Sequence, residues 1–151
     1  MKYWLLKSEP DAWSWDNHVK EGASMWDGVR NYQARNMMRD DMKVGDSILF
    51  YHSNAKPMAV VGIASVVREG YDDFHALDPD DKHYDPKATP EKPIWSMVDI
   101  KGERPLARPV TLAEIKENPK LKDMLLIRKG MRLSIQPITK EEFIEVVSQG
   151  G

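Results

Sequence analysis

The sequence predicts an α+β protein built on a twisted, barrel-like antiparallel β-sheet with short peripheral helices. Two observations indicate this class. Segments with β character begin the chain, fill its middle and return near its end, with short helical segments between them. Strands and helices do not alternate regularly, which argues against a doubly wound parallel sheet. The length of 151 residues is typical of one domain, so we expect a single domain spanning residues 1–151.

The N-terminal segments predict a buried strand followed by a helix. Residues 2–7, KYWLLK, are apolar and end at SEPD, as expected for a buried strand. In the following PDAWSWDNHVKEG, Pro10 suits a first helical turn and Gly22 suits a helix end. We expect Trp13 and Val19 to face the core.

The segment VRNYQARNMMRDDM predicts the main helix. Ala34, Met38 and Met42 recur at every fourth position and Met37 widens this apolar stripe, so we expect this side to be buried. Another face carries a polar row with the same spacing: Asn31, Arg35 and Arg39.

A hairpin and a long loop are predicted for the middle of the chain. A turn at Gly45 precedes the strand SILFYH, in which Ile48, Phe50 and His52 share one face. A second strand, MAVVGIASVVREGY, follows the polar loop 54–57, and its Gly62 marks a bulge or a close approach. Residues 78–93 contain four Pro and several Asp, which indicates a long surface loop.

The C-terminal third combines strands with capped helices. IWSMVDIKGERPLARPV and MRLSIQPI have β character. Thr111 and Glu114, like Thr139 and Glu142, have the spacing of a capping box at a helix start. Residues 121–128 predict a short helical or mixed piece.

Charge is unevenly distributed although the formal net charge is only −2. Residues 69–99 carry nine acidic residues and three Lys, a net of −6, whereas residues 101–140 carry ten Lys or Arg and four acidic residues, a net of +6. Two interpretations remain open: a solvated surface of mixed sign, or a basic face that meets phosphate while the acidic stretch turns away.

Composition excludes several chemistries. The absence of Cys excludes disulfides, zinc ribbons and thiol catalysis. The four His have no ligand spacing, and neither a Gly-x-Ser-x-Gly elbow nor a phosphate-binding Gly-rich loop is present, so we expect no metal and no cofactor. No apolar run is long enough for a signal peptide or a membrane span, so we expect an intracellular, cytoplasmic protein.

Polar and aromatic residues at strand ends are the remaining candidates for function. They occur at Lys7–Glu9, at Trp26–Asn31, at Tyr51–Asn54 and near Trp95. A flat heteroaromatic ligand needs this mixture, because aromatic faces stack on it while amides and carboxylates bind its edge. Trp26 lies beside an Asp-Gly pair before a helix and is the best candidate for an exposed aromatic, whereas Trp95 is more typical of a core residue.

Seven segments together resemble the EVE domain family, in order along almost the whole chain: YWLLKSEPDAWSW, MWDGVRNYQARNMMR, GDSILFYHSN, VVGIASVV, YDPK, PIWSMVDI and RLSIQPIT. The resemblance implies a PUA-like fold, which is a small twisted β-barrel with helices, and kinship to YTH domains, which bind N6-methyladenine. It further implies a non-catalytic module that binds DNA or RNA carrying a modified base, with modified cytosine favoured.

The resemblance also implies a pocket. Its residues would be Lys7, Ser8, Glu9, Pro10, Trp26, Asp27, Gly28, Val29, Asn31, Tyr32, Gln33, Arg35, Tyr51, His52, Ser53 and Asn54, with Trp95 as a further wall. Candidates for phosphate contact are Arg30, Arg35, Arg39, Arg128 and Arg132. YTH domains have Asn where this chain has Glu9, and a carboxylate there suits the exocyclic amino group of cytosine.

Two other functions remain as alternatives. One is an enzyme acting on modified nucleotides, with Glu9 or His52 as acid or base. The other is a small-molecule or protein interaction module on the same fold, since a fold alone does not fix function.

Overall fold

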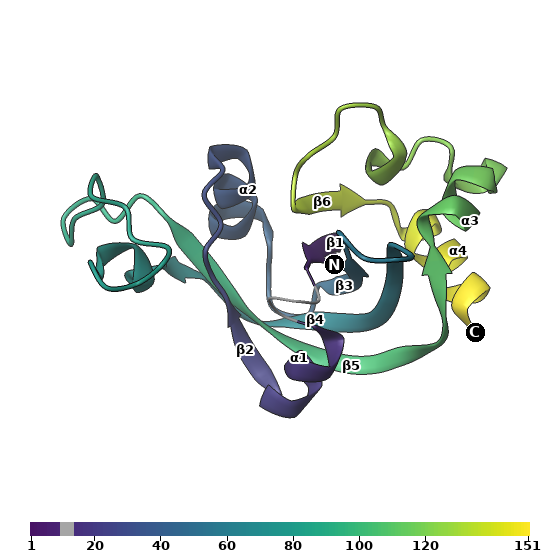
Figure 1. Ribbon diagram of the computed structural model, residues 1–151, viewed down its shortest axis with the longest axis horizontal. Helices are drawn as coiled ribbons and strands as arrows, with labels where there is room; N and C mark the ends of the chain where they lie inside the picture. The colour runs from purple at the N-terminus through teal and green to yellow at the C-terminus, as the bar shows by residue number, and fades with distance from the viewer. Residues whose placement is uncertain (10–13) are drawn as a thin grey trace.

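The computed structural model describes residues 1–9 and 14–151, and the strands of this part of the chain form one six-stranded mixed sheet (Figure 1). The strands are β1 (Tyr3–Ser8), β2 (Ala23–Trp26), β3 (Ser47–His52), β4 (Ala59–Asp72), β5 (Ser96–Thr111) and β6 (Ile135–Ile138). Their order in the sheet is β2-β5-β4-β3-β1-β6.

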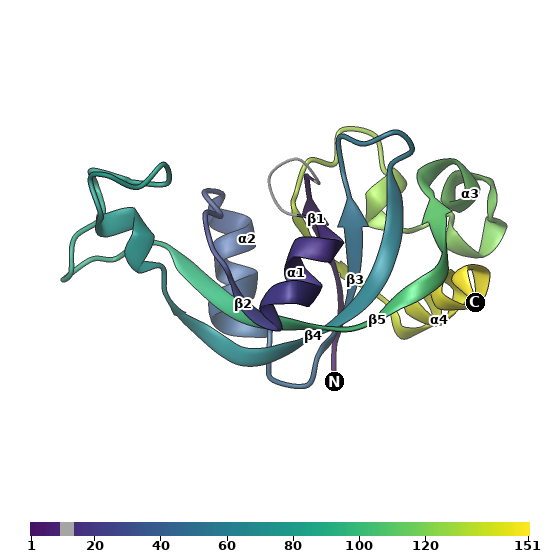
Figure 2. The same ribbon diagram turned by 60° about the horizontal axis from the view of Figure 1, so that its bottom comes forward.

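The prediction of an antiparallel barrel agrees with this sheet only in part. Four of the five strand pairs are antiparallel, but β1 and β3 run parallel. The sheet curves strongly along β4 and β5, yet β2 and β6 remain separate edges (Figure 2). The sheet is therefore open. The chain between β1 and β3 includes β2 and short helices, and after the turn at Gly45 it places β3 parallel to β1.

Short helices cover the sheet, and side chains fix where most of them begin. They are α1 (Trp15–Glu21), α2 (Tyr32–Asn36), α3 (Leu112–Glu117) and α4 (Lys140–Gly150), with a π-helical turn η1 (Met37–Asp41) and 3-10 turns η2 (Phe74–Leu77), η3 (Pro119–Leu121) and η4 (Leu125–Ile127). The capping boxes predicted at Thr111 and Thr139 are confirmed. A third such box, at Ser14, begins α1.

The interior side of α1 differs from the prediction. Val19 is 53% exposed, so the expectation that it faces the core is wrong. Because the helix begins at Trp15, its phase instead turns Trp15 and His18 inward. The predicted start at Pro10 and the expected burial of Trp13 fall outside the described residues.

The apolar stripe of the main helix is confirmed. Ala34, Met38 and Met42 are all fully buried. Their spacing spans α2 and η1, where the helix widens and the Met42 N–H donates to the Met37 carbonyl at 2.9 Å.

Two hydrophobic cores lie on opposite faces of the sheet. In β3, Ile48 and Phe50 enter one core whereas Leu49 and Tyr51 enter the other, as the alternation predicted. The register of β4 against β3 and β5 shifts around Gly62, where a Cβ atom would lie 2.6 Å from the Trp15 ring. The prediction of a bulge or close approach at Gly62 is confirmed.

The two longest strands carry an extension at one end of the molecule. β4 and β5 continue beyond the other strands and lead into residues 73–95, which connect them and are drawn at the left of Figure 1. This segment packs around a small cluster of its own, formed by Ala76, Ala88 and Trp95. Its predicted surface loop, residues 78–93, contains no strand.

Candidate nucleic-acid interface

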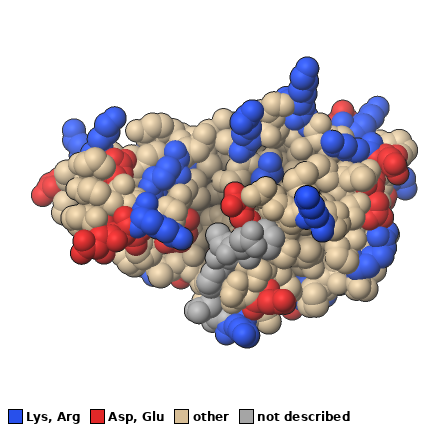
Figure 3. Space-filling view, viewed as in Figure 1, with Lys and Arg blue, Asp and Glu red and all other residues tan. Residues whose placement is uncertain are grey.

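An open cavity of about 1190 Å³ lies between the end of β1, the segment from β2 to α2, and the extension. Figure 3 shows the corresponding hollow near the centre of the molecule. The described residues that line it are Lys7, Ser8, Glu9, Ala23, Ser24, Met25, Trp26, Asp27, Gly28, Val29, Arg30, Asn31, His75, Asp80, Asp81, Lys82, His83, Asp99 and Ser134. Two of the predicted clusters, at residues 7–9 and 26–31, are therefore brought together here.

The end of β1 forms the first wall. The Lys7 N–H donates to the Ser134 carbonyl at 2.8 Å, and the Ser53 N–H donates to the Ser8 carbonyl at 2.9 Å, so neighbours on both sides hold this strand end. The Lys7 side chain is partly buried, and this burial lowers the pKa of its ammonium group. Glu9 is exposed and therefore lies at the rim.

Trp26, the last residue of β2, belongs to the second wall. Its ring meets the ring of Phe50 edge-on, with the centroids 5.8 Å apart, and it packs against the first core. The indole is nevertheless only partly buried and lines the cavity. The core thus fixes an aromatic ring that remains available for stacking.

Arg30 clamps the third wall, which residues 80–83 form. Its Nε and Nη2 atoms both donate to the His83 carbonyl, at 3.1 and 2.7 Å. Its Nη1 donates to Asp73 Oδ2 at 3.0 Å and to the Val29 carbonyl at 3.1 Å. Protein acceptors thus occupy the guanidinium, which positions the wall and leaves little capacity for a phosphate.

The same wall requires a glycine at position 28. Gly28 has φ +76°, and a Cβ atom there would lie 2.6 Å from Nε2 of His83. The Gly28 N–H donates to Asp73 Oδ2 at 3.0 Å. Sequence reasoning missed Asp73, His75 and residues 80–83 because they occur in or beside a segment that has the composition of a solvated loop.

Among the described residues, Asp27, Asp73 and His75 form a set of side chains that could hold a cation, and their potential ligand atoms lie within 4.8 Å of one another. His75 Nδ1 is 2.9 Å from Asp27 Oδ2 and 3.4 Å from Asp73 Oδ1, while Arg30 already supplies a positive charge to Asp73. These contacts bring together residues of the segment after β2 and of the extension. The expected absence of metal and cofactor remains a prediction.

The predicted cluster at the end of β3 lies outside the cavity lining. Tyr51 is 2% exposed in the second core, and burial raises its pKa to about 12. His52 Nε2 accepts the Trp15 N–H at 3.0 Å, and burial lowers the pKa of this imidazole. Ser53 supports β1 through its N–H, and Asn54 is exposed in the hairpin loop with φ 51°.

The predicted residues of α2 and Trp95 form a support beside the cavity. Tyr32 stacks on Trp95 with ring centroids 4.9 Å apart, and the Trp95 Nε1 donates to Asp85 at 2.7 Å. Arg35 lies over Tyr32 and donates to the Ile94 carbonyl at 2.9 Å. Trp95 is only 5% exposed, in agreement with the core interpretation.

Two other predicted residues, Gln33 and Arg39, are not among the described residues that line the cavity. Gln33 is exposed on α2, and Arg39 pairs with Asp40 on the surface at 2.8 Å. Pro10 falls outside the described residues.

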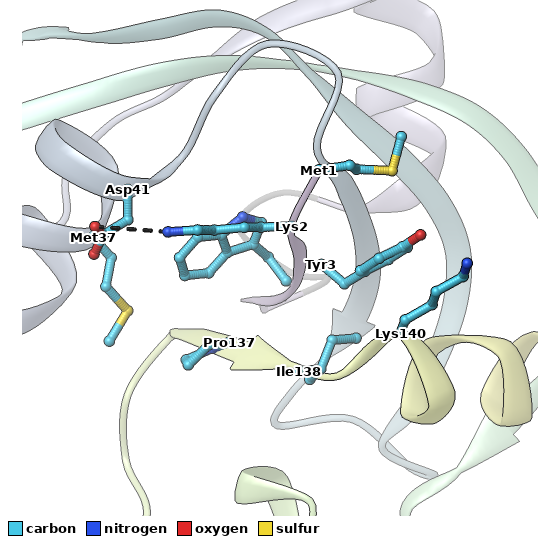
Figure 4. A pocket seen from close by; sticks show the side chains of 9 residues that line it. Met1, Lys2, Tyr3, Met37, Asp41, Pro137, Ile138 and Lys140 are labelled. Carbon is cyan, nitrogen blue, oxygen red and sulfur yellow. Dashed lines mark ion pairs between the residues drawn. The ribbon is translucent and has the colours of Figure 1, made fainter.

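A second, smaller cavity of about 660 Å³ lies between the start of β1, η1 and β6 (Figure 4). Tyr3, Met37 and Ile138 give it an apolar lining, and Lys2 and Asp41 form an ion pair of 3.9 Å at its side. It includes none of the predicted site residues.

The curved open sheet and its polar, aromatic cavity define a binding domain of the kind that the sequence motifs indicated. The EVE domain model matches residues 2–149, so the chain belongs to the EVE domain family. The resemblance found in the sequence is thereby confirmed.

Curated relatives and solved structures agree with this assignment. Thymocyte nuclear protein 1 of Danio rerio is 43% identical over 96% of this chain and 70% of that protein, and its Homo sapiens counterpart is 38% identical over 97% and 72%. A Leishmania major protein of 48% identity superposes with a TM-score of 0.94, covering 99% of this chain and 94% of that chain.

Another similar structure contains a ligand. Human THYN1 was solved in complex with 5-methylcytosine-containing DNA; it is 38% identical, with a TM-score of 0.89, and the match covers 99% of this chain and 98% of that chain. Within the described part of this chain, every helix is too short or too polar to cross a membrane. The expected cytoplasmic location remains a prediction.

Proposed function

We propose that this chain, as one EVE domain, is a non-catalytic DNA-binding module that reads a modified base, with modified cytosine favoured. The observation that carries the proposal is the likeness, over almost the whole chain, to human THYN1 bound to 5-methylcytosine-containing DNA. The cavity between Lys7–Glu9 and Trp26–Asn31 supports it, because it combines an aromatic ring with carboxylate and ammonium groups.

In this proposal the base leaves the DNA stack and enters the cavity. Extrusion costs roughly a few kcal/mol. Stacking on Trp26 returns about 1–3 kcal/mol. Glu9 accepts a hydrogen bond from the exocyclic amino group of cytosine, and a fully buried methyl group adds about 0.8 kcal/mol. We therefore expect a preference for the modified base that is clear but modest.

The geometry gives the enzymatic alternative little support. His52 lies outside the cavity lining, and its Nε2 is occupied by the Trp15 N–H. Glu9 is exposed at the rim, where its carboxylate oxygens can accept hydrogen bonds from a base edge. We propose that Glu9 recognises a base edge and performs no acid–base step.

The test is a binding titration with DNA duplexes that contain cytosine, 5-methylcytosine or 5-hydroxymethylcytosine at one position, and with matched RNA. Wild type is compared with Trp26→Leu, which keeps apolar bulk against Phe50, and with Phe143→Leu, which makes a comparable change at a partly buried aromatic on α4 outside the cavity lining. Thermal melting confirms that both variants fold.

We expect wild type and Phe143→Leu to prefer a modified duplex, and Trp26→Leu to lose about 5- to 150-fold in affinity, which corresponds to about 1–3 kcal/mol of stacking. Equal binding by Trp26→Leu and wild type would refute the cavity assignment. Tighter binding of RNA would refute the DNA assignment, and a change in base mass during incubation would support the enzyme.

A further inference from the structure

Three exposed cations lie on one loop beside the cavity. We define the basic loop as residues 128–132, RKGMR, which leaves η4 and leads toward β6. Arg128, Lys129 and Arg132 are all exposed. In Figure 3, Lys and Arg side chains stand beside the hollow where Figure 1 places this loop.

Backbone contacts hold the basic loop in a defined position. The Met131 N–H donates to the Arg128 carbonyl at 3.1 Å, and Gly130 takes the left-handed conformation with φ +80°. Two residues beyond the loop, Ser134 lines the cavity and accepts the Lys7 N–H. The basic loop therefore leads, within two residues of Arg132, into the first wall of the cavity.

The cations of the basic loop form no ion pair with the part of the chain that the structure describes. Among residues 1–9 and 14–151, the ion pairs of Lys and Arg occupy Lys2, Arg30, Arg39, Lys43, Arg108 and Lys120, and none includes the basic loop. When exposed Lys and Arg side chains neutralise phosphates, the counterions condensed on the DNA are released, and this release favours binding.

The third wall, residues 80–83, carries more acidic than basic side chains. Asp80 and Asp81 line the cavity there beside Lys82, and Asp27 and Asp99 lie among the other lining residues. Carboxylates next to a phosphate backbone cost electrostatic energy. A nucleic-acid backbone at the cavity mouth is therefore attracted to one side and repelled from the other.

We propose that the basic loop binds the phosphate backbone of the DNA strand whose base enters the cavity. The backbone follows the Ser134 side of the cavity mouth, away from Asp80 and Asp81. This inference rests on the proposed function and specifies the side from which the DNA approaches.

The experiment compares two triple variants that change the net charge equally, from −2 to −5. One carries Arg128→Ala, Lys129→Ala and Arg132→Ala. The control carries Lys116→Ala, Lys120→Ala and Lys122→Ala, on α3 and the turns that follow it. Affinity for a 5-methylcytosine duplex and for its unmodified counterpart is measured at several salt concentrations, and thermal melting confirms folding.

We expect the basic-loop variant to bind both duplexes roughly 10- to 100-fold more weakly at low salt, with a salt slope reduced by about 2 to 3. Its ratio of affinities for modified and unmodified DNA stays near that of wild type, and the control variant keeps the wild-type slope. An unchanged slope in the basic-loop variant, or an equal loss in both variants, would overturn the inference.

Failure of the proposed function gives a different result. If wild type binds DNA without preferring the modified base, base reading fails, whereas a loss of slope confined to the basic-loop variant still supports the loop as the backbone contact. Absence of any DNA binding by wild type at low salt would overturn both proposals.

Discussion

Replacing Arg30 tests whether this residue holds a wall of the cavity or contacts phosphate. Its side chain is 23% exposed and that of Asp73 is fully buried, so the pair is largely shielded from water. Arg30→Gln leaves the Asp73 carboxylate without its cation, although the Gly28 N–H still donates to it. The clamp on the His83 carbonyl is lost as well.

The magnitude follows from this burial. Removing one partner of a buried ion pair costs about 3–5 kcal/mol. Because solvent reaches part of Arg30 and Asp73 keeps a donor, we expect Arg30→Gln to lower the free energy of unfolding by about 2–4 kcal/mol. Arg30→Lys keeps the charge but loses the fork that binds His83, so it recovers only part of this loss.

The assay is a double-mutant cycle measured by urea denaturation, with Arg30→Gln, Asp73→Asn and both together. We expect a coupling energy of about 1–3 kcal/mol. Additivity within about 0.5 kcal/mol would refute the clamp. The salt slope of DNA binding provides a second readout: it should match wild type in Arg30→Gln, and a fall of about 1 would identify a phosphate contact instead.

Two further predictions concern Gly28 and His18. Gly28→Ala forces a Cβ toward His83 and should lower both the stability of the protein and its affinity for 5-methylcytosine DNA. The control is Gly45→Ala, which meets similar backbone strain of about 1–2 kcal/mol at φ +94° but has nothing within 4 Å of the new Cβ and should bind normally. Equal binding by the two variants would contradict this prediction. His18 is fully buried, and burial lowers the pKa of its imidazole. The unfolded chain therefore takes up a proton first, and stability should fall as the pH drops below about 6.5, by up to about 1.4 kcal/mol per pH unit. His18→Gln should flatten this dependence in urea denaturation at several pH values, and an unchanged slope would refute the assignment.

Local patterns in the sequence predicted most elements correctly, because the signals act over a few residues. Capping boxes at Thr111 and Thr139, and the stripe from Ala34 to Met42, depend on side chains within one or two helical turns. No local pattern predicts the parallel pairing of β1 with β3. The two strands are separated in the sequence by α1, β2, α2 and η1, so their pairing depends on long-range contacts.

The candidate site was predictable where residues from one strand end or turn stay together. Lys7–Glu9 and Trp26–Asn31 both line the cavity. His52 was predicted as a binding residue from its position at a strand end, but it lies outside the cavity lining and accepts the Trp15 N–H, a long-range contact that no local pattern indicates. Asp73 and His83 were missed for the same reason: their roles depend on Arg30, more than forty residues earlier.

The small cluster formed by Ala76, Ala88 and Trp95 has an evolutionary consequence. It gives residues 73–95 apolar contacts of their own, apart from the two main cores of the sheet, while Arg30 and Arg35 bind acceptors in this extension. Substitutions in the extension that spare these acceptors can reshape one side of the cavity without disturbing those cores. A change of ligand preference can therefore arise in this peripheral segment alone while the rest of the sheet stays the same.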